Sequence, residues 1–249
     1  MCTLILKKPS DATQELQIFG NRDERLDRAA SGFRQITIEK TIAWAPQDLE
    51  KGGTWLGVNE HGLFAGLTNR YAPQGYPNAD PAVSRGELPH VALAHDNVGA
   101  AAHRIRSMLS NANYPGFHLL LSTHDEARLM VWDGETLRED PLTHETTVIT
   151  ERSFAGPAPE RETLLRDIVS PMSQPLSLDE VTNVLSTHAP NSMDAVCVHL
   201  DGINYGTRTA VCINLGPSVD ETEVWESNSP PCNAKWRKVG LGVNRKHDT

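Results

Sequence analysis

The stretch MCTLILKKPSDATQELQIFGNRDE, residues 1–24, decides how this chain begins to fold and where its chemistry lies. Thr3 to Leu6 and Leu16 to Phe19 are two apolar runs separated by the turn-rich segment Lys7 to Thr13. Apolar runs with a turn between them predict a β-hairpin. Cys2 therefore stands at the start of the first strand.

The charged cluster Asn21-Arg22-Asp23-Glu24 follows the second strand, which we expect Gly20 to end. In an antiparallel hairpin the end of the second strand lies beside the start of the first, so this cluster is a predicted neighbour of Cys2. An arginine there could lower the thiol pKa or hold a substrate carboxylate, and an aspartate could orient an amino group. The alternative is a solvated charged turn, because further charges follow.

Cys2 becomes the amino-terminal residue if an aminopeptidase removes Met1. Its thiol and α-amino group then belong to one residue, and with reference pKa values of about 8.5 and about 8 the amine can accept the thiol proton. The alternative is that Cys2 is simply the second residue of a strand.

The composition favours a single domain spanning residues 1–249 with a small-molecule partner. The 39% hydrophobic content can form a substantial core, and the net charge of -9 argues against a partner of nucleic acid or anionic membrane. There is no charged segment followed by an apolar one and no run of eighteen apolar residues, so we expect no signal peptide and no membrane span. A cytoplasmic location fits best, while the oligomeric state is left open.

No cofactor and no metal site is expected. The four cysteines form no C-x-x-C pair, and the ten histidines show no H-E-x-x-H or other ligand spacing. Cys197 and Cys212 lie in apolar runs and are interpreted as packing thiols, whereas Cys232 is expected to be exposed without a base nearby.

The remaining elements predict an α+β fold, an αββα sandwich of two mainly antiparallel sheets between helical layers, because strands, helices and strands follow one another in blocks. Glu60-His61-Gly62 predicts the clearest hairpin turn, and Asn69 to Pro89 a long loop at a substrate-facing rim. The expected helices are 91–110, 159–169 and 177–186, the last with a Ser177–Glu180 capping box. The other expected strands are 55–59, 63–68, 117–122, 128–132, 146–150, 195–200, 205–215 and 223–227, with weak alternation over 35–45.

Two further polar residues stand at strand ends. Asn69 ends a strand with an amide that could donate to an oxyanion, or it simply begins a loop. Arg208, in Tyr205-Gly206-Thr207-Arg208, could reach an anionic substrate or pair with a surface acid.

Taken with Gly52-Gly53-Thr54-Trp55-Leu56-Gly57 and Leu67-Thr68-Asn69, these motifs resemble the NRDE proteins of the transport and Golgi organisation type. That family is similar to the N-terminal-nucleophile hydrolases of the choloylglycine hydrolase and penicillin acylase or acyltransferase kind, which have an αββα fold. The resemblance implies that Cys2 is the nucleophile, Asp23 the acid that orients the amine, Asn69 an oxyanion-hole amide and Arg208 a late active-site arginine.

The chain departs from those hydrolases at two positions. Their arginine precedes the aspartate by three residues, whereas Arg22 directly precedes Asp23. Glu151 stands where they carry a second asparagine, and a carboxylate would repel an oxyanion unless it points away. The substrate-binding candidates are Asn21, Arg22, Glu24 and Glu151.

The resemblance implies an amidohydrolase or acyltransferase that acts on a small amide or thioester after loss of Met1. The alternative is a non-catalytic binder or carrier of a lipid, acyl-CoA or haem-like metabolite on an inactivated hydrolase fold.

Overall fold

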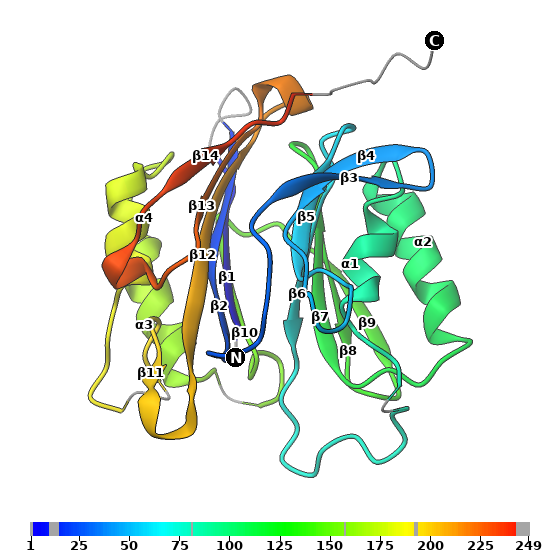
Figure 1. The fold of residues 1–249 in the computed structure, drawn as a ribbon, viewed down its shortest axis with the longest axis horizontal. Helices are drawn as coiled ribbons and strands as arrows, with labels where there is room; N and C mark the ends of the chain where they lie inside the picture. The colour runs from blue at the N-terminus through cyan, green and yellow to red at the C-terminus, as the bar shows by residue number, and fades with distance from the viewer. Residues whose placement is uncertain (1, 10–14, 81, 157, 192–193, 243–249) are drawn as a thin grey trace.

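Two antiparallel sheets lie face to face in a computed structural model that describes residues 2–9, 15–80, 82–156, 158–191 and 194–242 (Figure 1). The first sheet has the order β10-β1-β2-β12-β13-β14, with the short β11 beside β12. Its strands are β1 (Cys2–Lys7), β2 (Leu16–Arg25), β10 (Thr146–Thr150), β11 (His199–Leu200), β12 (Tyr205–Leu215), β13 (Glu223–Ser227) and β14 (Arg237–Val239).

The second sheet follows chain order, β3 to β9, so that each strand pairs with the next along the chain. Its strands are β3 (Arg34–Ile38), β4 (Thr41–Ala45), β5 (Leu56–Asn59), β6 (Phe64–Asn69), β7 (Phe117–Ser122), β8 (Ala127–Trp132) and β9 (Leu137–Pro141).

Helices cover the outer face of each sheet (Figure 1). The described helices are α1 (Glu87–Ala92) and α2 (Val98–Leu109) on the second sheet, α3 (Glu160–Val169) and α4 (Leu178–Leu185) on the first, and three 3₁₀ turns, η1 (Asp201–Ile203), η2 (Val219–Glu221) and η3 (Pro231–Asn233). The predicted α+β sandwich is therefore confirmed. No helix among the described residues is long and apolar enough to cross a bilayer.

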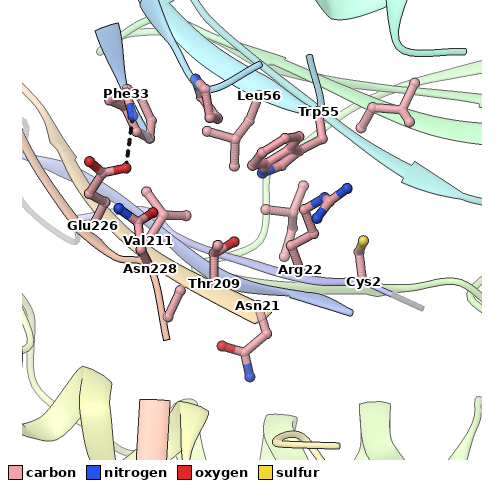
Figure 2. A pocket seen from close by; sticks show the side chains of 15 residues that line it. Cys2, Asn21, Arg22, Phe33, Trp55, Leu56, Thr209, Val211, Glu226 and Asn228 are labelled. Atoms are coloured by element: carbon pink, nitrogen blue, oxygen red, sulfur yellow. Dashed lines mark hydrogen bonds between the residues drawn. The ribbon is translucent and has the colours of Figure 1, made fainter. Parts of the chain in front are cut away.

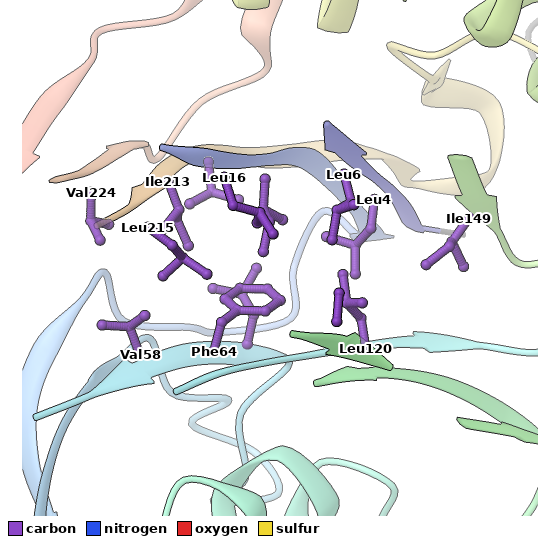
Figure 3. Packing of buried hydrophobic residues seen from close by; sticks show 14 of the residues in the cluster. Leu4, Leu6, Leu16, Val58, Phe64, Leu120, Ile149, Ile213, Leu215 and Val224 are labelled. Carbon is purple, nitrogen blue, oxygen red and sulfur yellow. The ribbon is translucent and has the colours of Figure 1, made fainter. Parts of the chain in front are cut away.

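The alternation of side chains along β1 explains this layering. Leu4 and Leu6 pack between the two sheets with Phe64 and Leu120 of the second sheet (Figure 3), whereas Ile5 packs toward α3 and α4. Apolar side chains on both faces of a strand require a layer on each side of the sheet. The burial of both faces of β1 thus follows from its composition.

Gly20 does not end the second strand, contrary to the sequence prediction. β2 continues to Arg25, because Gly20 serves a close approach between neighbouring strands: a Cβ at this position would lie 2.1 Å from the backbone oxygen of Thr3. The cluster at 21–24 consequently belongs to the strand itself and is not a charged turn.

The helix predicted over 91–110 is two helices. Asn97 has an extended backbone, with φ of −151°, and its side chain accepts a hydrogen bond from the Ala100 N–H, so α2 begins only after it. α1 begins inside the predicted loop, with Pro89 in its first turns, where the absent N–H of a proline is tolerated. Apolar spacing alone did not reveal this break.

The strand predicted over 195–200 is reduced to β11. The N–H groups of Val196 and Cys197 both donate to the Thr187 carbonyl, and their backbone is thereby tied to the segment after α4 instead of to a neighbouring strand. The weak alternation over 35–45 corresponds to the hairpin of β3 and β4.

Several local predictions are confirmed. Gly62, with φ of 76°, turns the chain between β5 and β6, and the Ser177–Glu180 capping box begins α4. The turn predicted over 7–13 falls largely on residues 10–13, which lie outside the described residues, as does Met1.

Candidate active site

Cys2 begins β1 and is paired across the hairpin with Arg22 of β2. Paired residues of an antiparallel ladder project to the same face of the sheet, and both side chains point toward the second sheet (Figure 2). The Arg22 guanidinium lies 4.2 Å from the centre of the Trp55 ring, which holds it beside the thiol. The predicted proximity of Cys2 to the charged cluster is confirmed.

β2 divides that cluster between the two faces of the first sheet. Arg22 and Glu24 face the cleft, where the Glu24 carboxylate lies 3.6 Å from the Arg22 guanidinium and 3.0 Å from that of Arg28. The Asn21 side chain points the other way (Figure 2), and its amide nitrogen donates to the carbonyls of Leu185 and Val196. Asn21 thus fastens the helical layer to β2.

Asp23 is buried at the base of the site, 3% exposed. Its carboxylate accepts a hydrogen bond of 2.5 Å from the Thr207 hydroxyl and lies 3.7 Å from the Arg161 guanidinium. Burial raises the pKa of this carboxyl from 3.8 to about 6, although Arg161 and Thr207 act in the opposite direction. Asp23 is therefore ionised at neutral pH and loses its charge in mildly acidic solution.

The Cys2 thiol is a weak acid in this setting. Burial raises its pKa above the ordinary value and the Asp23 carboxylate adds to the rise, while the Arg22 guanidinium lowers it. A thiol with a raised pKa carries its proton at neutral pH. Its use as a nucleophile then requires a base within reach.

A cleft of about 500 Å³ opens over Cys2. Asn69 lines it from the end of β6, and Tyr76, Asp80 and Arg85 line it from the loop between β6 and α1. The loop predicted as a rim therefore does border the cavity that contains Cys2. Of the basic side chains in the cleft, Arg28 is paired with Glu24 and Asp48, at 3.0 and 2.5 Å.

Glu151 lies on the helical side of the first sheet, just after β10, and is not among the described side chains that border the cleft. Its carboxylate is 3.5 Å from the Arg161 guanidinium and 3.7 Å from that of Arg152. Arg161 therefore stands between two buried carboxylates, Glu151 and Asp23. The charge of Glu151 is balanced by arginine instead of being directed at an oxyanion.

Arg208 occupies a β-bulge, where the register of β12 against β2 shifts between Thr207 and Thr209. Its guanidinium donates to the backbone carbonyl of Arg28, and it does not border the cleft in the part of the chain that the structure describes. Arg208 is thus connected to the site only indirectly, through its hydrogen bond to the segment that carries Arg28.

Sequence reasoning missed two residues that hold Asp23. Thr207 directly precedes Arg208 in the same motif, and its hydroxyl donates to the Asp23 carboxylate. Arg161 is 3% exposed on α3, and a charge among the apolar positions of an amphipathic helix was a signal that it has a buried partner.

Four metal-ligand side chains also gather away from the cleft, contrary to the expectation from spacing. They are His188, Cys197, His199 and Cys232, whose ligand atoms all lie within 4.8 Å of one another.

The two facing sheets between helical layers are the fold of the N-terminal-nucleophile hydrolases. Penicillin V acylase from Agrobacterium tumefaciens shares it with a TM-score of 0.62 and 13% identity, over 96% of this chain and 86% of that one. The Caenorhabditis elegans orthologue of N-acylethanolamine-hydrolysing acid amidase has a TM-score of 0.61 and 12% identity, over 88% of this chain and 96% of that one. A variant of conjugated bile acid hydrolase from Clostridium perfringens has a TM-score of 0.59 and 10% identity, over 97% of both chains.

The chain itself belongs to the family Transport and Golgi organisation 2, which residues 1–230 match. None of the curated proteins compared with it matches. The structural likenesses, at 10 to 13% identity, show the fold.

Proposed function

We propose that this protein is an N-terminal-nucleophile enzyme that hydrolyses or transfers the acyl group of a small amide or thioester after removal of Met1. The observation that carries the proposal is the position of Cys2: it begins the interior strand β1, borders a charged cleft and is paired with Arg22. The solved structures of the same fold include, by their printed names, a penicillin V acylase and an orthologue of an acid amidase that hydrolyses N-acylethanolamines, which supports the same class of reaction.

In this mechanism the α-amino group of Cys2 accepts the thiol proton as sulfur attacks the substrate carbonyl. The amine then gives that proton to the leaving group, and a tetrahedral intermediate collapses to an S-acyl enzyme. Water, or an acceptor amine or thiol, attacks the thioester in the second half and restores the thiol. Asp23 is the candidate for orienting the amine, because its buried carboxylate is ionised at neutral pH.

Asn69 and Arg22 are the candidates for binding the oxygen that becomes negative. Asn69 lines the cleft with Cys2, and an amide N–H is a suitable donor to an oxyanion. One terminal nitrogen of Arg22 is buried and has no hydrogen-bond partner among the described residues, so a substrate oxygen would satisfy it. Asn69 and Arg22 thus offer side-chain N–H groups to a substrate carbonyl oxygen.

The Cys2→Ala variant tests the proposal. Protein with a sequenced amino terminus is incubated with an activated ester, and the acyl adduct is located by peptide mass spectrometry. We expect an adduct at Cys2 in the wild type, none at residue 2 of the variant, and an unchanged adduct in the matched control Cys212→Ser. Equal labelling of wild type and Cys2→Ala, or a retained Met1 in protein from its native cell, would overturn it.

Binding without turnover is the second candidate function. The apolar cavity next to Cys2, bordered by Phe33, Leu56 and Val211, is only about 20 Å³, far below the several hundred Å³ of a typical ligand pocket (Figure 2). A lipid or haem therefore finds little apolar room beside the thiol. Native mass spectrometry that detects a co-purified hydrophobic ligand, with no acylation of Cys2, would favour the carrier over the enzyme.

A further inference from the structure

The cluster of His188, Cys197, His199 and Cys232 comes from three separate segments of the chain. His188 follows α4, Cys197 precedes β11 and His199 begins it, and Cys232 lies in the 3₁₀ turn η3. Two thiols and two imidazoles are the donor set of a tetrahedral zinc site. Their wide separation in sequence explains why spacing did not reveal them.

The three distances among the ligand atoms of Cys197, His199 and Cys232 match one face of a tetrahedron around a metal ion, and the His188 ligand atom lies within 4.8 Å of all three. The two sulfur atoms, of Cys197 and Cys232, lie 3.7 Å apart, and the His199 Nε2 atom lies 3.3 and 3.4 Å from them. Zinc with bonds of about 2.3 Å to sulfur and about 2.0 Å to nitrogen requires edges of about 3.8 Å between sulfurs and about 3.5 Å between sulfur and nitrogen. The observed edges agree with these values to within about 0.2 Å.

The geometry is not that of a disulfide or of stacked histidines. A disulfide needs its sulfurs at about 2.05 Å, and the four cysteines are free thiols. The rings of His188 and His199 are tilted by 57° with centres 5.3 Å apart, so each can present a nitrogen to a common point.

Backbone and side-chain hydrogen bonds hold the three segments together around this point. The Thr187 carbonyl, next to His188, accepts from the N–H groups of Val196 and Cys197, both at 3.0 Å. The Trp236 ring, four residues after Cys232, donates to the Thr182 hydroxyl of α4 at 2.8 Å. The ligands are thus positioned before any ion arrives, which lowers the entropic cost of binding.

We propose that these four side chains form a structural Zn²⁺ site. Soft thiolates select zinc over magnesium or calcium, and four protein ligands complete the tetrahedron and leave no open position for a substrate. Binding releases the two thiol protons to solvent, so two thiolates neutralise the charge of the ion. The distances that support this Zn²⁺ site do not depend on the function proposed for Cys2.

The test combines metal analysis with Co²⁺ as a spectroscopic probe on the full-length chain. Protein from zinc-supplemented cells is analysed by inductively coupled plasma mass spectrometry, then stripped with a chelator and titrated with Co²⁺. We expect one Zn²⁺ per chain, and, with Co²⁺, sulfur-to-metal charge-transfer absorption that saturates at one equivalent and disappears on addition of Zn²⁺.

Exposed ligands give variants that leave the core intact. Cys232→Ser and His188→Ala should each reduce Zn²⁺ affinity by at least about tenfold, whereas the matched controls Cys212→Ser and His103→Ala should retain one ion per chain. Circular dichroism checks that each variant is folded. The proposal is wrong if the folded wild type neither retains Zn²⁺ nor gives the Co²⁺ thiolate band, or if protein isolated under thiol-blocking conditions contains a Cys197–Cys232 disulfide.

Discussion

Two clusters on the first sheet contain cysteines, and their surroundings differ. At the first cluster a single cysteine, Cys2, lies among charged groups, with Arg22 beside it and the cleft over it. The Cys197 and Cys232 sulfurs lie 3.7 Å apart, with the His199 imidazole nitrogen 3.3 and 3.4 Å from them and a His188 nitrogen within 4.8 Å. A single thiol next to a cavity is arranged for attack on a carbonyl, whereas converging thiols and imidazoles are arranged to hold an ion.

A short chain of hydrogen bonds connects the two clusters. Val198, between Cys197 and His199, donates its N–H to the Thr207 hydroxyl at 2.8 Å, and that hydroxyl donates to the Asp23 carboxylate at 2.5 Å. The two clusters are therefore expected to carry out separate chemistry, and a change at one cluster should affect the other only weakly, through these hydrogen bonds. Each of the following measurements tests one side of that comparison or the connection itself.

The largest effect is expected from blocking the amino group of Cys2 while keeping its thiol. A short, uncleaved extension before Cys2 should lower the rate of acylation by an activated ester by about 10³-fold or more, because the proposed base is lost. Cleavage of the same extension to expose Cys2 provides the matched control and should restore the rate. Rapid acylation of the extended protein would show that another base serves the thiol.

The next largest effect on acylation is expected from Asp23→Asn. The amide cannot compensate the positive charge of the amine, so we expect acylation to fall by about 10²–10⁴-fold at neutral pH. In the wild type the rate should decline as the pH falls through about 6, where Asp23 becomes protonated. A rate profile of Asp23→Asn that keeps this decline would show that another group is responsible.

Asp23→Asn should also change how the free energy of unfolding depends on pH. Because the folded pKa of Asp23 is raised from 3.8 to about 6, the folded state binds the proton more tightly, and its stability decreases as the pH rises from about 4 to 6. Denaturant unfolding across this range should show that slope in the wild type and lose it in Asp23→Asn. An unchanged slope would contradict the assignment of the raised pKa to Asp23.

Arg22→Gln should slow acylation by about 10 to 100-fold, because the guanidinium lowers the pKa of the Cys2 thiol. The pH at which the rate reaches its plateau should move upward, and Arg22→Lys should restore part of the shift. The stacking of Arg22 on Trp55 makes full rescue by lysine unexpected. A lower rate with no movement of the pH profile would show that Arg22 does not act through the pKa of the thiol.

The smallest effect on Cys2 is expected from removing the proposed Zn²⁺. Chelation should lower the free energy of unfolding by about 3–4 kcal/mol, the value for an ion present at 100 to 1,000 times its Kd, while acylation slows only a few-fold. Thr207→Val breaks the connection to Asp23 and should make acylation insensitive to the chelator. Equal loss of activity and stability on chelation would mean that the two clusters are one functional unit.

The hairpin and its consequence for Cys2 were predictable because they depend on neighbours in sequence. Two apolar runs with a turn between them set β1 and β2, and antiparallel pairing then brings the cluster at 21–24 beside residue 2 with no knowledge of the rest of the fold. The hairpin of β5 and β6 and the cap of α4 were equally local. The prediction failed at Gly20, since only the neighbouring strand shows that the glycine is needed for close packing and not for a turn.

Tertiary structure alone decided what surrounds the two clusters. The contact of Asp23 with Arg161 joins β2 to a helix more than a hundred residues away, and the four zinc-ligand side chains meet only after α4, β11 and η3 have packed. Spacing in sequence carries no information about such contacts, because the intervening chain can take many paths. The sequence by itself thus determined the strand that presents Cys2, while packing determined which charges and ligands stand around it.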